Sequence, residues 1–265
     1  MPQQLIAVVG PKGGVGRTFI ACNLALSLQV RTGLKVALLD CDWQAGDVAV
    51  HLDLVGHDGI EMLLPYIDDL VKGGLDGRLV QHGSGLRVLL APAKPEIAGL
   101  IKRDQLRQVL LAVRSVFDLA VVDTPAGLDN WVTDEVTNHA TKVLVVATPG
   151  PCALRRTKQF LQRFQPGEQR LLLVVNQATG RLLPVSRVAS FLGDLRTLSV
   201  PALAARVDES ELYGRPVSTQ PGEIGLALRQ LVDFVCPGLS AQQAGPGWLA
   251  RAWGWVSARY GRQVA

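Results

Sequence analysis

The stretch Gly10-Pro11-Lys12-Gly13-Gly14-Val15-Gly16-Arg17-Thr18 decides the fold of this chain. It follows an apolar run from Leu5 to Val9 and precedes a helical pattern that begins near Phe19. A buried strand, a glycine-rich turn and a helix N-terminus in this order form a cradle for phosphate. The glycines let backbone N–H groups converge on an anion, and the helix end adds partial positive charge. The Thr18 hydroxyl, in the first helical turn, is placed to bind Mg²⁺.

The same stretch departs at two positions from the strict phosphate-loop pattern, G-x-x-x-x-G-K-[ST]. Pro11 stands in place of the first glycine, and Arg17 stands in place of the lysine. Arginine keeps the charge and can bind a phosphate with two N–H groups, but it is longer and planar. By the strict pattern alone, a glycine-rich turn without a ligand is the competing interpretation.

Composition sets the broad class of the protein. The chain has 265 residues, of which 48% are hydrophobic and 5% aromatic, and this suits a parallel sheet of Val, Leu and Ala. The net charge of +4 is compatible with an anionic ligand, an acidic membrane or nucleic acid. The four cysteines lack C-x-x-C spacing, which disfavours a zinc or iron–sulfur site and a disulfide framework. No signal peptide and no run of ~20 apolar residues is recognised, so a cytoplasmic location is expected.

Two carboxylates follow the second apolar run of the chain. Lys35 to Leu39 predicts a buried strand, and Asp40 and Asp42 come directly after it. Ligands of open α/β sheets bind in the crevice beyond the carboxyl ends of the strands, so both side chains are expected to face that crevice. A solvated acidic turn is the alternative interpretation.

A third carboxylate, Asp123, ends another apolar run, Leu119 to Val122. An Asp at the tip of a buried strand is the Walker B arrangement, in which the carboxylate accepts a hydrogen bond from magnesium-bound water or from the Thr18 hydroxyl.

The rest of the chain alternates between strand and helix patterns. The expected elements are a helix over Ile60–Leu75, a strand over Leu86–Ala91, a turn over Pro92–Glu96, a helix over Arg103–Val116, a strand over Lys142–Ala147, a loop and helix over Gly150–Phe164, strands over Leu171–Val175 and Ser199–Ala202, and a helix over Glu223–Phe234. This alternation with short connections predicts an α/β fold with a doubly wound, mostly parallel sheet.

Together these motifs resemble the MinD/ParA family of ATPases, whose deviant Walker A loop reads K-G-G-x-G-K-[ST] in a P-loop NTPase fold of the SIMIBI type. The resemblance covers roughly residues 4 to 235 and implies an ATPase that binds ATP and Mg²⁺. It implies that Lys12 reaches across a nucleotide-sandwich homodimer to the partner's phosphates. Asp42 would orient or deprotonate the attacking water, and Asp40 would support the magnesium shell together with Thr18 and Asp123.

The resemblance also assigns the nucleotide site. The implied nucleotide-binding residues are Gly13, Gly14, Val15, Gly16, Arg17, Thr18, Phe19, Asn176 and Asp208, and the implied switch II residues are Pro125 and Gly127. Asn176 would recognise adenine, although Gln177 replaces the basic residue that usually follows. The form D-x-D-x-Q-x-G-D from Asp40 to Asp47 is similar to the pilus-assembly branch called CpaE or TadZ.

The end of the chain differs in composition from the rest. Residues 1–236 are expected to form the nucleotide-binding domain, 237–247 a Pro- and Gly-rich linker, and 248–265 an amphipathic tail helix. Aromatic and apolar side chains beside arginines are typical of a helix that lies in a lipid headgroup layer. The expected membrane contacts are Trp248, Leu249, Trp253, Trp255, Val256 and Tyr260. A helix docked on its own core and a nucleic-acid-binding tail are the alternatives.

These features favour a dimerising ATPase switch of the CpaE/TadZ type, peripherally associated with the inner face of the cytoplasmic membrane. Two weak tails joined in one dimer bind more tightly than one, by ~10²–10⁴. Such a protein would position a pilus or secretion machine, or mark a cell pole or septum, with partner proteins that the sequence does not name. A catalytically silent nucleotide-binding scaffold is the second hypothesis. A ParA-like DNA-segregation ATPase is the third, and the modest charge disfavours nucleic acid as a partner.

Overall fold

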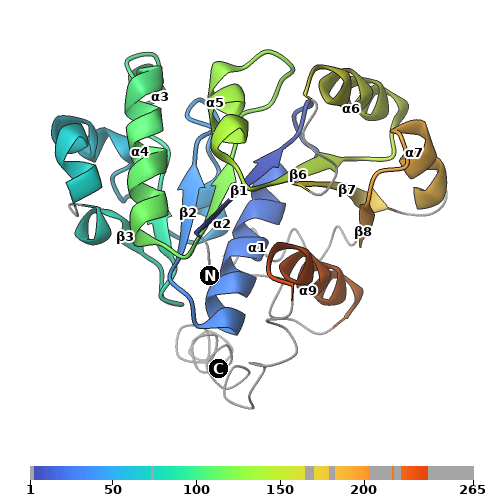
Figure 1. Cartoon of the computed structure of the whole chain (residues 1–265), viewed down its shortest axis with the longest axis horizontal. Coiled ribbons are helices and arrows are strands. Elements are labelled where there is room, and N and C mark those ends of the chain that lie inside the picture. Colours follow the sequence, from blue (N-terminus) through green and yellow to red (C-terminus); the bar gives the residue numbers. More distant parts are fainter. Residues whose placement is uncertain are drawn as a thin grey trace.

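The computed structural model describes residues 3–72, 75–164, 170–178, 183–202, 217 and 222–237. These residues form an eight-stranded sheet in the order β3-β4-β2-β5-β1-β6-β7-β8 (Figure 1). The strands are β1 (Gln4–Val9), β2 (Val36–Asp40), β3 (Val80–Gln81), β4 (Arg87–Leu89), β5 (Leu119–Asp123), β6 (Lys142–Ala147), β7 (Leu171–Ala178) and β8 (Thr197–Pro201). All neighbouring strands are parallel except β3 and β4, so the predicted doubly wound, mostly parallel sheet is confirmed.

Helices cover both faces of the sheet, which is why its strands are apolar on both sides. On one face lie α1 (Arg17–Thr32), α2 (Val48–His51) and α9 (Glu223–Val235). On the other lie α4 (Arg103–Val116), α5 (Trp131–His139), α6 (Pro151–Arg163), α7 (Val185–Phe191) and the 3₁₀ helix η2 (Leu64–Lys72) (Figure 1). Every residue of β2 and β5 is buried between these layers. Two separate apolar cores, one on each face, therefore hold the sheet.

The strand order also places the candidate site. In the sheet, β5, β2 and β4 lie on one side of β1, and β6, β7 and β8 lie on the other side. Ligands of such sheets bind where the order reverses, beyond the carboxyl ends of the strands. In the register of β2 and β5, Asp40 lies opposite Asp123, and Val8 of β1 lies opposite Asp123 on the other side. The topology therefore brings the two carboxylates to one edge beside the glycine-rich turn.

Most predicted elements are confirmed, and α4 has the predicted bounds. The predicted helix over Ile60–Leu75 is wrong. The chain there forms 3₁₀ segments, η1 (Ile60–Met62) and η2, followed by η3 (Asp76–Arg78), with non-helical dihedral angles at Tyr66. Pro65 explains the difference, because a proline removes a backbone donor and its ring clashes with the preceding turn.

Other elements have no counterpart among the predictions. They are the short helix α2, the short strand β3, the four-residue helix α3 (Pro95–Ala98) within the expected turn, and the helices α5 and α7. The predicted tail helix at 248–265 and nearly all of the predicted linker lie outside the described residues. Among the helices of the described ranges, none is long and apolar enough to pass through a bilayer.

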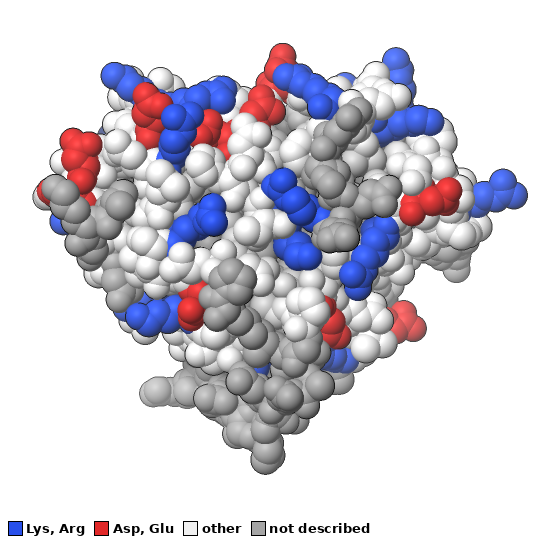
Figure 2. Space-filling view, in the orientation of Figure 1, with Lys and Arg blue, Asp and Glu red and all other residues white. Residues whose placement is uncertain are grey.

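Charged side chains are spread over the face shown in Figure 2. The chain has 27 Lys and Arg residues against 23 Asp and Glu residues, and along the upper rim of this face the two signs are interspersed (Figure 2). A broad field of one sign is the usual electrostatic footprint for nucleic acid. The mixed rim on this face gives the DNA hypothesis no support.

Candidate functional site

The glycine-rich turn between β1 and α1 forms an anion-binding geometry. Gly14 and Gly16 have φ angles of 73° and 88°, which only glycine adopts without strain. Gly16 is the N-cap of α1 and has no side chain with which to cap the helix, and the first turn holds no acidic residue. Within the described part of the chain, no side chain accepts from the first-turn N–H groups, and together with the positive end of the helix dipole these groups favour an anionic ligand.

A cavity of about 1010 Å³ opens at this turn. Its lining includes the loops after β1 and β2, the segments that follow β5 and β6, and residues at the carboxyl ends of β7 and β8. The lining residues are Gly13, Gly14, Gly16, Arg17, Thr18, Phe19, Asp42, Gln44, Ala45, Asp47, His51, Pro125, Ala126, Asn130, Thr148, Pro149, Gly150, Asn176, Gln177, Val200, Pro201, Ala202 and Ile224. The volume lies at the upper end of the range of pockets that hold small ligands, up to about 1,000 Å³.

Thr18 and Asp123 meet beneath the turn. The Thr18 hydroxyl donates to Asp123 Oδ2 at 2.6 Å, and Asp123 is fully buried. Its other oxygen, Oδ1, is buried without a hydrogen-bond partner among the described residues. Burial raises the pKa of Asp123 to about 7, although the Thr18 hydrogen bond and the charge of Arg17 oppose this shift. A hydroxyl beside a carboxylate with an unsatisfied oxygen is a set of hard oxygen donors that fits Mg²⁺. Thr18 and Asp123 would hold the ion, which supplies positive charge for phosphate oxygens.

Asp40 holds the loop that follows β2. Its Oδ1 accepts from the Asp42 N–H at 3.1 Å and its Oδ2 from the Val48 N–H at 3.3 Å. Burial raises the pKa of Asp40 well above its usual value, and the charge of Asp123 adds to this shift. Asp40 therefore fixes the backbone from Asp42 to Val48, and its predicted support of the magnesium shell stays a prediction.

Arg17 and Asp42 form a buried ion pair. Arg17 Nη2 lies 3.2 Å from Asp42 Oδ2, and the two side chains are 8% and 11% exposed. Arg17 Nη1 also donates to the Gly10 carbonyl at 3.5 Å. Burial raises the pKa of Asp42, while the charge of Arg17 opposes this shift. The residue expected to act on water is thus bound to the residue that replaces the phosphate-loop lysine.

Other predicted residues take different positions. Lys12 is exposed and lies outside the cavity lining. Pro125 lines the cavity, and Gly127 has a φ angle of 127°. Asn176 is buried, lines the cavity and donates to the Val15 carbonyl at 2.8 Å, which ties the end of β7 to the glycine-rich turn. Asp208 and the predicted membrane contacts lie outside the described residues.

Part of the cavity wall was not predicted from the sequence. Thr148, Pro149 and Gly150 line the cavity directly after β6, and Asn130 lines it at the start of α5. The signal was available for the first three, because they follow the predicted strand Lys142–Ala147 at its carboxyl end. Asn130 caps α5 by accepting from the Val132 N–H, and the helix itself was not predicted.

Two tryptophans join the loop after β2 to α5. Trp43, next to Asp42, and Trp131, the first residue of α5, pack edge to face with their ring centroids 5.8 Å apart. The guanidinium of Arg103 lies 5.5 Å from the centre of the Trp131 ring. This contact connects the wall of the cavity to α4.

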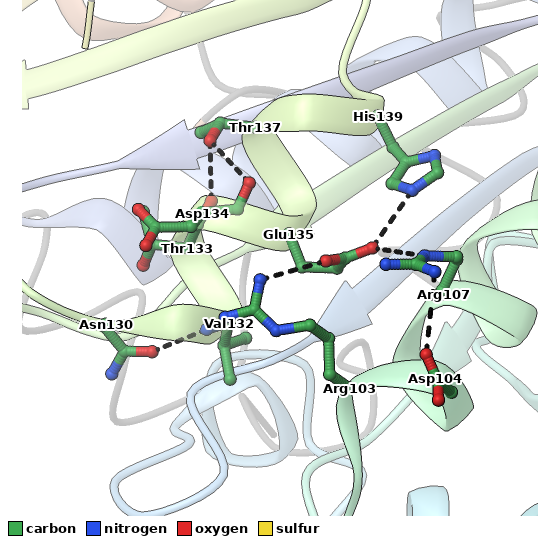
Figure 3. A network of polar contacts seen from close by, with 10 residues as sticks. All are labelled: Arg103, Asp104, Arg107, Asn130, Val132, Thr133, Asp134, Glu135, Thr137 and His139. Atoms are coloured by element: carbon green, nitrogen blue, oxygen red, sulfur yellow. Dashed lines mark hydrogen bonds and ion pairs between the residues drawn. The ribbon is translucent and has the colours of Figure 1, made fainter.

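A polar network then fastens α4 to α5 (Figure 3). The buried carboxylate of Glu135 accepts from Arg107 Nε at 2.9 Å and from Arg103 Nη1 at 3.3 Å, and it lies 3.2 Å from His139 Nε2. Partial burial opposes ionisation, but the hydrogen bond and charge of Arg107 lower the pKa of Glu135 below its usual value. Glu135 is therefore a charged anchor between the two helices.

The parallel sheet, the glycine-rich turn at the start of α1 and the Thr18–Asp123 contact define a P-loop nucleotide-binding protein. The family model described as ParA, NUBPL iron-transfer P-loop NTPase, matches residues 2–189.

Individual proteins agree with this class. Septum site-determining protein MinD of Synechocystis sp. is 26% identical over 244 residues, which cover 90% of this chain and 86% of that protein. Antiactivator FleN of Pseudomonas aeruginosa is 36% identical over 157 residues, or 58% of this chain and 53% of that protein. The solved structure of septum site-determining protein MinD complexed with Mg-ADP from Pyrococcus horikoshii OT3 has a TM-score of 0.76 at 19% identity and covers 91% of this chain and 99% of that one. The chain belongs to the ParA/MinD family of P-loop ATPases.

Proposed function

We propose that this chain is an ATP- and Mg²⁺-binding ATPase that hydrolyses slowly, dimerises with ATP and positions a membrane-associated machine. The observation that carries the proposal is the hydrogen bond from the hydroxyl of Thr18, which lines the cavity of about 1010 Å³, to the buried carboxylate of Asp123. The similarity to a septum site-determining protein supports a role in placing other proteins. The motif after β2 supports the CpaE/TadZ pilus-assembly branch, and the exposed side chain of Lys12 is available for a partner subunit.

Nucleotide binding and turnover are tested with the full chain and Mg-ATP. We expect saturable binding of ATP and ADP by calorimetry and a slow release of phosphate. Thr18→Ala should weaken the magnesium-dependent part of binding, because it removes one of the two oxygen donors. Asp42→Ala should lower the rate of release, and an unchanged rate would show that Asp42 has no part in hydrolysis.

A nucleotide-binding scaffold without turnover is the second candidate. The ion pair between Arg17 and Asp42 favours it, since Asp42 then has a partner other than water. Arg17→Lys decides between the two. Under the first proposal the wild type hydrolyses ATP measurably, whereas under the second only the lysine variant does.

The membrane role rests on the sequence of the tail alone. We expect the protein to sediment with anionic liposomes in the presence of ATP and to do so much less with ADP. A variant with Trp248, Trp253 and Trp255 replaced by serine should stay in the supernatant with either nucleotide. Equal sedimentation of all samples would contradict a nucleotide-controlled attachment.

The matching family model is described as an iron-transfer protein, but the thiols of this chain give little support to an iron-binding function. Cys22, Cys41 and Cys236 are buried and Cys152 is exposed. Burial raises the pKa of Cys22 and Cys41 well above the usual value and that of Cys236 to about 11. Thiolate is the form that binds iron, so the three buried cysteines are poor ligands.

A further inference from the structure

Arg17 lies between the carboxylate of Asp42 and the turn that is expected to bind phosphate. It begins α1 at the phosphate-binding turn and lines the cavity, yet its Nη2 is bound to Asp42 at 3.2 Å. A guanidinium binds a carboxylate or a phosphate through the same N–H groups. The two partners cannot both take the same donor.

Packing allows Arg17 to reach Asp42. A Cβ atom at Gly10 would lie 2.8 Å from Arg17 Cδ and 2.9 Å from Arg17 Cγ, so the aliphatic part of the side chain lies against the bare backbone of Gly10. The carbonyl of the same glycine accepts from Nη1. Gly10 therefore directs the guanidinium toward the loop after β2.

The backbone around Asp42 is held independently of this pair. Asp40 fixes the N–H groups of Asp42 and Val48, and Trp43 packs on Trp131. A change of partner at Arg17 would then move side chains while the loop keeps its backbone anchors. The pair is a side-chain contact that can open without unfolding the wall of the cavity.

We propose that Arg17 exchanges partners, from Asp42 to the phosphates of a nucleoside di- or triphosphate. Only this exchange frees the carboxylate of Asp42 to act on the attacking water. The proposal rests on the proposed nucleotide binding and adds that Asp42 competes with the ligand. Arg17 is thus a positioning residue for Asp42. When only a fraction of the protein is open for binding, the apparent affinity falls by that fraction.

The experiment compares ADP affinities of full-length variants by isothermal titration calorimetry. Asp42→Asn should tighten ADP binding about tenfold, as expected if about a tenth of the wild type has Arg17 free. Asp47→Asn is the matched control for the loss of a negative charge. Asp47 is exposed and lines the same cavity, but the hydrogen bonds of Arg17 go to Gly10 and Asp42 and not to Asp47. Screening by solvent should limit its effect to about twofold.

The background of Arg17→Gln isolates the exchange. Glutamine cannot pair with a carboxylate by charge, so adding Asp42→Asn there should tighten ADP binding no more than Asp47→Asn does. Equal tightening in both backgrounds, or equal tightening by the two aspartate changes, would overturn the exchange and assign the effect to general repulsion.

A double-mutant cycle, measured by thermal unfolding of the same variants without nucleotide, tests the contact between Arg17 and Asp42 separately from nucleotide binding. Coupling between Arg17→Gln and Asp42→Asn is expected, since residues in direct contact are not additive. Absence of coupling would overturn the pair. Coupling together with a failure of every protein to bind ADP or ATP would show that the proposed function is wrong and would overturn the exchange while leaving the contact established.

Discussion

Gly10 shows how a residue without a side chain shapes the site. An added Cβ would lie 2.8 Å from both Arg17 Cδ and Val15 Cγ2, which is closer than van der Waals contact allows. Both neighbours are buried, so neither can move into solvent without loss. The glycine is required here for close packing, not for an unusual backbone angle.

Gly10→Ala should therefore lower the free energy of unfolding by about 1–3 kcal/mol, the usual cost of overpacking. It should also disturb the pair between Arg17 and Asp42. Gly13→Ala is the matched control, because apart from its two chain neighbours no other described residue has an atom within 4 Å of the Cβ position there. Urea denaturation measures both variants, and equal losses would contradict the packing argument.

Asp123 makes stability depend on pH. Its pKa is raised by burial to about 7, against about 3.9 in an unfolded chain. Between these values the folded protein keeps a proton that the unfolded chain has lost, so stability falls as pH rises, by up to about 1.4 kcal/mol per pH unit. Burial also raises the pKa of Asp40 and Asp42, which adds to the fall.

Asp123→Asn isolates the contribution of this carboxylate. The unfolding free energy of the variant should exceed that of the wild type increasingly from about pH 4 to about pH 7 and by a constant amount above that window. Denaturation at a series of pH values in the absence of magnesium measures the difference. Parallel profiles for the two proteins would mean that Asp123 titrates normally.

At the scale of elements, α4 and α5 are joined by one buried carboxylate. Glu135 is 4% exposed, while the side chains of Arg103 and Arg107 are 46% and 47% exposed. The arginines can be hydrated if the contact is lost, whereas the carboxylate cannot. The energy of the network therefore depends mainly on Glu135.

Glu135→Gln should lower the free energy of unfolding by about 1.5–3 kcal/mol, the range for hydrogen bonds to charged groups. The difference in unfolding free energy between wild type and Glu135→Gln should become smaller at low pH. The reason is that the pKa of Glu135 is lowered in the folded state, so its carboxylate stabilises the protein above the pKa of the unfolded state and this stabilisation is lost as pH falls through the pKa of the folded state. Asp104→Asn, at the far side of Arg107 and 84% exposed, is the control, with an expected change below about 1 kcal/mol. A similar decrease of the unfolding free energy in both variants would show that the burial of Glu135 does not make its contacts more stabilising than an exposed ion pair.

At the scale of the whole molecule, the cavity wall comes from most of the sheet. Most lining residues lie at or just after the carboxyl ends of β1, β2, β5, β6, β7 and β8, so a ligand in the cavity would contact segments on both sides of β1 in the sheet. Binding at such a position stabilises the native state as a unit.

Mg-ADP at 100 times its dissociation constant should raise the free energy of unfolding by about 2.7 kcal/mol. Differential scanning fluorimetry would detect this as a higher Tm. Chelation of magnesium should reduce the increase, and Thr18→Ala should make the increase less sensitive to chelation, since Thr18 is one of the two proposed ligands. A Tm that is independent of ADP would count against the proposed function.

The sequence predicted the sheet and much of the site because both depend on local patterns. Buried parallel strands are continuous apolar runs, and Asp40, Asp42 and Asp123 are found by the strands that they follow. The partner of Arg17 was not predictable, because it depends on how a long side chain packs on Gly10 and reaches across the turn. The 3₁₀ segments near Pro65 were missed because the apolar spacing resembles that of an α-helix. The helix α5 was missed because its hydrophobic stripe is short, and its position depends on Trp43 and Glu135.

The edge-to-face pair of Trp43 and Trp131 is also an optical device. Two indoles whose centroids lie 5.8 Å apart at an interplanar angle of 63° have coupled electronic transitions, which produce a paired signal in ultraviolet circular dichroism. The chain has five tryptophans, and the other three lie at 248, 253 and 255, so replacing those with phenylalanine leaves a single coupled pair of chromophores. The amplitude of this signal therefore reports changes in the distance and mutual orientation of the two rings, and so of the segment after β2 relative to α5, without any added label.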